Sequence, residues 1–202
     1  MPSDWFLLLV LAYGALAVAN AQQQRQRIAL LARALQPLQI ERLMQTLIQG
    51  YLRAMGEHDG ERRAQVLGSL QASEADLRSQ VERLADQFQR TPPAQARVSR
   101  LPIALPWATQ VLPAASFDLR RALAIHAAGI ARALDNTAQL PARERAFTVT
   151  AELLLLQHTC HWYCKSRAVA SARLITRHHT PWAQAIAAVT PETRAAYLAL
   201  VH

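Results

Sequence analysis

The sequence is poor in the residues that build β-structure, disulfide frameworks and flexible loops. Its 202 residues include 6 Gly and 2 Cys, and only 6% are aromatic. β-Sheets favour β-branched and aromatic residues, and a disulfide framework needs more cysteines than two. The abundant residues are Ala, Leu, Gln and Arg, and all four are good helix formers. The composition therefore predicts an all-α protein.

Lysine is almost absent, because Lys165 is the only one, and arginine supplies nearly all of the positive charge behind a formal net charge of +8. The charge is uneven, and residues 92–202 hold twelve basic and five acidic side chains. A basic half predicts attraction to nucleic acid or to anionic lipid. Aromatic residues do not accompany the charge as nucleic-acid recognition requires. We therefore favour a solvated helical surface and do not expect nucleic acid as a partner.

The sequence also lacks the common catalytic motifs. It contains no Gly-rich phosphate loop, no H-E-x-x-H and no G-x-S-x-G. Glu152 lies in an apolar stretch, where burial raises the pKa of a carboxyl group, but one such residue does not make an acid–base pair. We expect a protein that acts by binding an unidentified protein partner, as a scaffold or adaptor.

One apolar run without charge occupies residues 5–19, and a polar run of Gln and Arg begins at residue 22. As a helix, residues 5–21 would span about 25 Å, at the short end of the length that crosses a bilayer. A signal peptide cleaved near Ala21 and a buried core helix are the alternatives. An A-x-A pattern at 19–21 favours cleavage, but residues 1–4 lack the positive charge of a signal peptide.

The charges that flank residues 5–21 predict their orientation. Three arginines follow the run before any acidic residue, whereas only Asp4 precedes it. By the positive-inside rule, the C-terminal side stays in the cytoplasm. We therefore favour residues 1–21 as an uncleaved anchor of a bacterial inner membrane. Ala15 and Ala19 form a small-xxx-small pair that would let two anchors pack as a homo-oligomer.

Residues 22–90 are predicted to form an amphipathic helical arm. Apolar side chains recur there at spacings of three and four, and Pro37 and Gly56 mark a break and a stop. The second half of the arm, residues 61–90, is either one long helix or two helices, with Ser73 as the N-cap of the second.

The remainder of the chain divides into a connector and a bundle. Residues 91–115 hold half of the protein's 10 prolines together with large apolar residues, which predicts an ordered, extended connector rather than a flexible linker. Residues 116–202 are predicted to form a C-terminal helical bundle. Its expected helices cover 117–135, capped by Ser116, a long helix from Pro141 to about 178, and two short ones that begin at Thr180–Pro181 and Thr190–Pro191.

One cluster has the residue types for metal or haem binding. Two His and two Cys stand within residues 158–165, and imidazole and thiolate bind zinc or haem iron. On a helix, Cys160, His161 and Cys164 share a face about 100° wide, and His158 lies about 60° further round. These four residues are the candidate ligands, with zinc or haem as the candidate cofactor.

The alternative is that the cluster belongs to the core. Leu153 and Leu156 fall on the same helical stripe as the cysteines, which would then be small apolar residues, and His126 is expected to be a hydrogen-bonded core histidine. We favour this interpretation, since structural zinc sites draw ligands from two separated pairs. A basic patch follows the cluster, part of which suits the negative end of a helix dipole. Its residues are Lys165, Arg167, Arg173 and Arg177.

Overall fold

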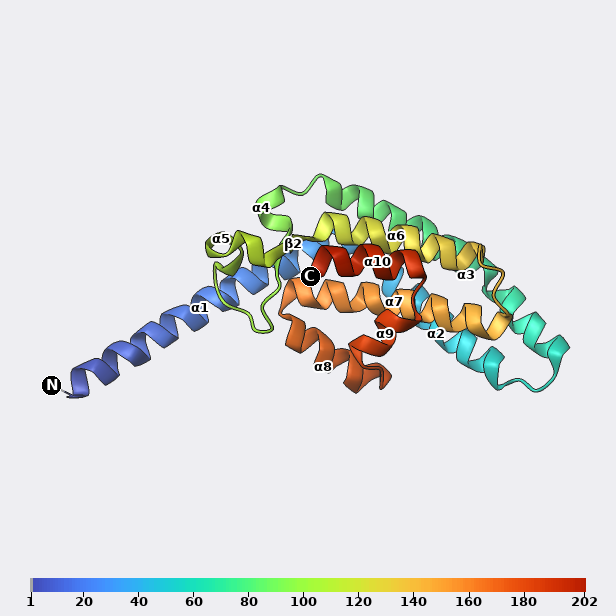
Figure 1. Cartoon of the computed structure of the whole chain (residues 1–202), viewed down its shortest axis with the longest axis horizontal. Coiled ribbons are helices and arrows are strands. Elements are labelled where there is room, and N and C mark those ends of the chain that lie inside the picture. Colours follow the sequence, from blue (N-terminus) through green and yellow to red (C-terminus); the bar gives the residue numbers. More distant parts are fainter. Residues whose placement is uncertain (1) are drawn as a thin grey trace.

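The computed structural model describes residues 2–202, with side chains from Trp5 onward, and 80% of it is helical. Within this part of the chain there are ten α-helices and two strands of three residues each, so the fold is all-α, as predicted. Helix α1 extends from one end of a helical body, and the hairpin of α2 and α3 lies at the opposite end (Figure 1).

The elements follow one another with few long loops. They are α1 (Pro2–Leu35), α2 (Ile40–Gly56), α3 (Gly60–Gln89), α4 (Pro93–Ala96), β1 (Arg97–Ser99), α5 (Ala108–Val111), the 3-10 helix η1 (Pro113–Ala115), β2 (Ser116–Asp118), α6 (Leu119–Asp135), α7 (Ala142–Cys164), α8 (Arg167–His178), α9 (Trp182–Ala188) and α10 (Pro191–Val201).

Helix α1 is long and apolar enough to cross a membrane, and within the described residues it is the only helix that is. Its apolar side chains from Trp5 to Val18 are exposed rather than packed into the body. The buried-core interpretation of this run is therefore wrong. The helix does not end at Ala21 but continues without interruption to Leu35, which gives it a length of about 51 Å.

Helices α2 and α3 form the predicted hairpin. The break between α1 and α2 includes Pro37, and α2 ends at Gly56 as expected. The carboxylate of Asp59 caps α3 by accepting a hydrogen bond from the Glu61 backbone N–H at 2.8 Å. The second half of the arm is one helix, and Ser73 lies within it rather than at an N-cap.

Residues 91–115, which we predicted to be an extended connector, contain three short helical segments and one strand. Strand β1 pairs antiparallel with β2, and Val98 lies opposite Phe117. Ser116 is part of β2, so the prediction that it caps α6 is wrong. Asp118 takes that role, because its carboxylate accepts a hydrogen bond from the Arg120 backbone N–H at 2.9 Å.

Helix α7 runs through the middle of the body. It is buried on nearly all sides between Val149 and Tyr163, as expected for a helix that is hydrophobic all round. It ends at Cys164 and does not continue to residue 178. The backbone of Lys165 is non-helical, and the Ser166 hydroxyl caps a new helix, α8, by accepting a hydrogen bond from the Val169 N–H.

The last two helices begin in different ways. The Thr190 hydroxyl caps α10 by accepting a hydrogen bond from the Thr193 N–H, with Pro191 in the first turn, as predicted. Thr180 does not cap α9. Its hydroxyl donates to the His178 carbonyl, and α9 begins one residue later than expected, after Pro181.

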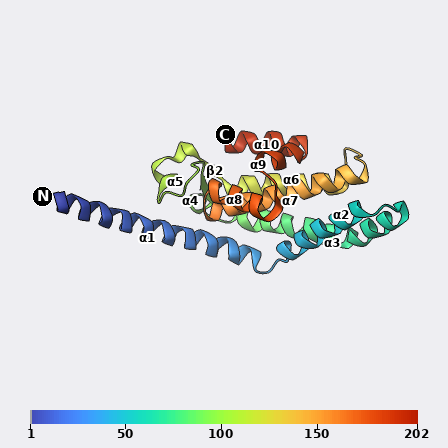
Figure 2. The same ribbon diagram turned by 90° about the horizontal axis from the view of Figure 1, so that it is seen from below.

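Most buried apolar side chains of the arm and of the bundle belong to one core, and Leu154, Leu174 and Ala185 form a second, smaller cluster. Helices α6 and α7 lie in the middle layer of the body, with α10 on one side and the α2–α3 hairpin on the other (Figure 2). The second half of α1 packs against α7 at the end of the body from which the apolar half of α1 emerges.

Candidate functional site

The polar residues that follow the apolar run attach α1 to the body. The Asn20 side chain donates to the Ala104 carbonyl at 3.3 Å, and the Gln23 side chain accepts from the Trp107 backbone N–H at 3.3 Å. On the α7 side, Lys165 donates to the Gln24 side chain at 2.8 Å. The connector and the end of α7 therefore hold α1 directly after its apolar half.

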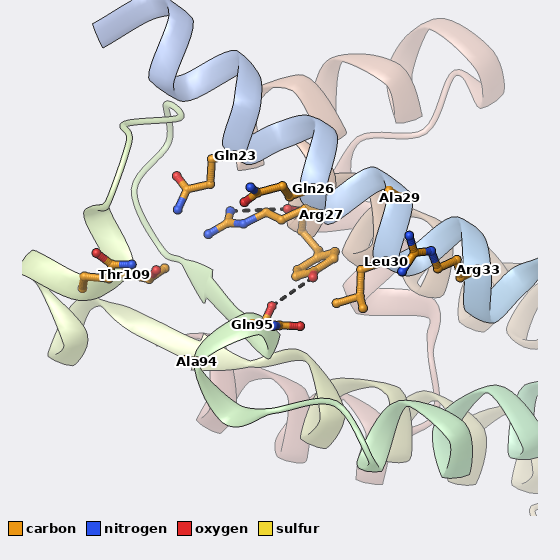
Figure 3. A pocket seen from close by; sticks show the side chains of 11 residues that line it. Gln23, Gln26, Arg27, Ala29, Leu30, Arg33, Ala94, Gln95 and Thr109 are labelled. Carbon is orange, nitrogen blue, oxygen red and sulfur yellow. Dashed lines mark hydrogen bonds between the residues drawn. The ribbon is translucent and has the colours of Figure 1, made fainter. Parts of the chain in front are cut away.

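A cavity of about 480 Å³ lies beside this attachment, between α1, α4, α5 and the end of α7. We call it the α1–α5 cavity, and Figure 3 shows its side chains. Amide and guanidinium groups dominate its polar lining, and none of its lining residues is acidic. The residues are Gln23, Gln26, Arg27, Ala29, Leu30, Arg33, Ala94, Gln95, Thr109, Gln110 and Tyr163.

Arg27 is the central cation of the cavity. Its side chain is half-buried, lies over the Tyr163 ring at 5.7 Å from the ring centroid, and donates to the Tyr163 carbonyl at 3.4 Å. The Tyr163 hydroxyl in turn donates to the Gln95 carbonyl at 2.9 Å (Figure 3). Within the described residues, no carboxylate forms an ion pair with Arg27. The guanidinium therefore keeps N–H donors for a ligand.

A second cavity, the α1–α7 groove, lies on the other face of α1 and has a volume of about 280 Å³. Its lining is mostly apolar and comes from α1, α2, α3, α7 and α8. Cys160, His161 and Cys164 all line it, so the three residues predicted to share a helical face open on the same space. The groove has the character of an apolar binding surface.

The two thiols in the groove are protonated at neutral pH. Burial raises the pKa of Cys160 to about 12 and that of Cys164 to about 11. A thiol with such a pKa is a poor nucleophile and a poor metal ligand, because both roles require the thiolate. The structure thus gives the cysteines the environment of small apolar side chains.

The two histidines of the cluster have partners other than the thiols. The His158 ring nitrogen Nε2 is 3.0 Å from the Ser171 hydroxyl, and the ring packs edge-on against Trp162. The His161 nitrogen Nδ1 lies 3.2 Å from an Arg173 guanidinium nitrogen, a neighbour that disfavours a bound cation. No three His, Cys, Asp or Glu side chains in residues 5–202 are arranged to hold a metal ion.

The four residues of the basic patch face different neighbours. Lys165 is held by Gln24, and the Arg167 guanidinium lies over the Trp182 ring, 4.7 Å from the ring centroid. Arg173 contacts His161, and Arg177 is exposed on α8. Two of the four cations are thus engaged inside the body rather than presented as one surface.

His126 and Glu152 occupy the core, as expected. The His126 nitrogen Nε2 is 2.9 Å from the Thr159 hydroxyl, and burial lowers the pKa of this imidazole to about 3. Glu152 is fully buried and accepts hydrogen bonds from the Thr190 N–H and hydroxyl at 3.0 and 2.9 Å. Burial raises the pKa of its carboxyl group, as its apolar surroundings predicted.

The residues of the α1–α5 cavity were not identified from the sequence. In the sequence, Gln23, Arg27 and Arg33 belong to the polar segment that follows the apolar run. Gln23 and Arg27 are four residues apart and therefore share a helix face, and Arg33 lies about 120° from Arg27. This spacing is the signal that the sequence offers for the cavity. The sequence has no signal that would add Gln95 and Thr109 to the cavity, because only the fold brings the connector beside α1.

Comparison with known proteins finds no match: no protein-family model, no curated protein and no solved structure is significantly similar to this chain.

Proposed function

We propose that this chain is a single-pass protein of the bacterial inner membrane whose helical body lies in the cytoplasm and acts as an adaptor for a protein partner. The observation that carries the proposal is helix α1. Its apolar half is exposed along its length, and its polar half is packed into the body without an intervening loop.

The charge distribution supports the orientation. The residues that follow the apolar run include Arg25, Arg27 and Arg33, and the bulk of the positive charge lies further along the chain. The segment before the run has Asp4 and no basic side chain. Basic residues next to a span are retained on the cytoplasmic side, so the N-terminus faces outward in the proposed arrangement.

The connector supports a position of the body close to the bilayer. It exposes five large apolar side chains, and Val111 is 74% exposed. They lie beside the point where α1 leaves the body, because Ala104 and Trp107 are bonded to Asn20 and Gln23. Such a patch is typical of a surface that contacts a membrane or a partner. The five residues are Ile103, Leu105, Trp107, Val111 and Leu112.

The chemistry of the body favours binding over catalysis. Its buried imidazoles and thiols are held neutral, since burial lowers the pKa of His158 to about 3 and raises that of Cys160 to about 12. Groups used in acid–base or nucleophilic catalysis have pKa values near the working pH. The two cavities beside α1 offer binding surfaces instead.

Membrane insertion is tested by fractionating cells and measuring the intact mass of the untagged protein. The proposal expects the full-length mass of 22.4 kDa in the membrane fraction, and loss of membrane association when residues 2–21 are deleted. A mass that lacks residues 1–21 in an extracytoplasmic fraction would mean export after cleavage and would overturn it. A C-terminal tag should resist protease in intact spheroplasts and be digested after lysis.

The adaptor role is tested by native mass spectrometry of the complex extracted from membranes in mild detergent. The expected result is a complex that releases a second, different polypeptide on dissociation in the gas phase, beside the 22.4 kDa chain; added mass that comes only from bound lipid or detergent does not count as a partner. Detection of the monomer alone, or of integer multiples alone, would overturn the adaptor proposal. Integer multiples would point to the homo-oligomer instead.

A further inference from the structure

We propose that the α1–α5 cavity binds the phosphate group of an anionic membrane lipid and that Arg27 is its principal ligand. The lipid as the source of the phosphate rests on the proposed membrane function. The cavity as an anion site rests only on the side chains that line it.

The first argument is the unbalanced charge. Arg27 is half-buried, and the hydrogen bond that it donates to the Tyr163 carbonyl is long at 3.4 Å. A partly desolvated cation without a counter-charge is unfavourable, and an anion that enters the cavity relieves this cost. The planar guanidinium fork matches phosphate oxygens, which it binds through two parallel hydrogen bonds.

The second argument is the set of neutral donors around the cation. The Gln23 amide oxygen accepts from the Trp107 N–H, so the NH₂ group of the same amide remains available to donate. Gln26 and Gln110 also line the cavity, and Thr109 adds a hydroxyl. Several convergent donors with no acidic side chain among them form a site for an oxyanion rather than for a cation.

The third argument is depth along α1. The polar headgroup layer is about 5–8 Å thick on each side of the hydrocarbon core, which corresponds to about four or five residues of helix after Ala21. Gln23 lies within this layer, and Arg27 lies about 9 Å beyond Ala21. Helical side chains lean toward the N-terminus of their helix, so the Arg27 guanidinium is directed back toward the headgroups.

The fourth argument concerns the lipid's acyl chains. The exposed apolar side chains of the connector flank the cavity through α5, which contributes Thr109 and Gln110 to its wall. Trp107 lies next to them and is 49% exposed, and tryptophan favours the membrane interface. A phosphate in the cavity would thus have apolar surface at the same level, as a lipid requires and a free phosphate ester does not.

The test uses the full-length protein purified in a neutral detergent. Phosphatidylglycerol, phosphatidylcholine and inorganic phosphate are titrated separately, and bound species are counted by native mass spectrometry. We expect saturable binding of one phosphatidylglycerol and weaker binding of the other two. Arg27→Gln should weaken phosphatidylglycerol binding about tenfold or more, because a charge-assisted hydrogen bond is lost.

Two controls separate a site from general attraction. Arg25→Gln removes the same charge from an exposed position of α1 outside the cavity and should leave the affinity within about twofold. Ala29→Glu keeps Arg27 but adds an acid to the cavity lining, and it should weaken binding, whereas the neutral Ala29→Gln should not. Thermal unfolding of each variant shows that the fold is retained.

An equal effect of Arg27→Gln and Arg25→Gln would overturn the site, as would binding that no cavity variant changes. Tighter binding of inorganic phosphate than of phosphatidylglycerol would overturn the lipid as the ligand. These failures are distinct from failure of the proposed function. An exported, cleaved protein would overturn the anchor, while a membrane-bound protein whose lipid binding ignores Arg27 would overturn this inference alone.

Discussion

Glu74 of α3 and Arg145 of α7 form a two-pronged ion pair, with N–O distances of 3.0 and 2.6 Å. The Tyr51 hydroxyl of α2 donates to the same carboxylate at 2.5 Å. Both charged side chains are largely shielded from solvent. The pair thus joins the α2–α3 hairpin to α7, the central helix of the bundle, at a position that is largely shielded from solvent.

Glu74→Gln is expected to lower the free energy of unfolding by about 2 kcal/mol, because it leaves the Arg145 charge partly buried without its partner. The value lies below that for a fully buried pair, since solvent still reaches part of both groups. Urea titration followed by circular dichroism measures it. Arg78→Gln, which breaks the exposed pairs of Arg78 with Glu82 and Asp135, should leave the midpoint almost unchanged. Equal losses of unfolding free energy in the two variants would contradict the stabilising role of the Glu74–Arg145 ion pair.

Gly129→Ala is expected to destabilise the protein by about 1–3 kcal/mol, although alanine is normally the better helix former. A Cβ at residue 129 would overlap the Thr193 hydroxyl and lie 2.6 Å from a Glu152 carboxylate oxygen. The matched control is Gly68→Ala in α3, where a Cβ meets nothing within 4 Å, so a gain of about 0.5–1 kcal/mol is expected. Thermal unfolding of both variants checks the opposite signs.

The buried histidines predict a loss of stability in mild acid. Burial lowers the pKa of both His126 and His158 from 6.5 to about 3. Between these values the unfolded chain binds protons that the folded chain does not, so stability falls as the pH decreases below about 6.5. Each histidine contributes a slope of about 1.4 kcal/mol per pH unit well below the unfolded pKa.

His158→Gln should remove about 1.4 kcal/mol per pH unit from the slope of unfolding free energy between pH 4.5 and 5.5. Denaturant titrations at several pH values give this slope independently of any constant loss of stability. The exposed His58 provides the control, and His58→Gln should leave the slope close to that of the unmodified protein. A slope unaffected by His158→Gln would contradict the buried, neutral state of this imidazole.

The thiols of the α1–α7 groove should react slowly in the folded protein. Burial raises the pKa of Cys164 to about 11 and that of Cys160 to about 12, so the thiolate is scarce at pH 7.5. Iodoacetamide labelling followed by intact mass should show alkylation at least about tenfold slower than in urea. Rapid labelling of either cysteine under native conditions would show that the groove opens or that its thiols are activated.

Local signals predicted the parts of the fold that local chemistry decides. Pro37, Gly56 and the Thr190–Pro191 pair each mark a helix boundary through a backbone or capping requirement of their own, and the structure has boundaries there. The apolar run at residues 5–19 similarly predicted a helix that is able to cross a membrane.

The break between α7 and α8 shows what such signals miss. No proline or glycine stands at Lys165 and Ser166, and the helical pattern continues through them. After the turn, Arg167 packs over Trp162 of α7 and Trp182 of α9, and a local sequence pattern does not reveal such tertiary contacts. The α1–α5 cavity was missed for the same reason, since Gln23 and Thr109 become neighbours only in the folded protein.

The uninterrupted passage of α1 from its exposed apolar half into the body has a mechanical consequence. A flexible linker would let the body rotate freely and sample a hemisphere around its attachment point, whereas a continuous helix does not. In the proposed arrangement, a change in the tilt of the span is the same motion as a reorientation of the body. The interfacial anchors and neighbouring helices that set that tilt would then decide which faces of the body a partner in the cytoplasm can reach.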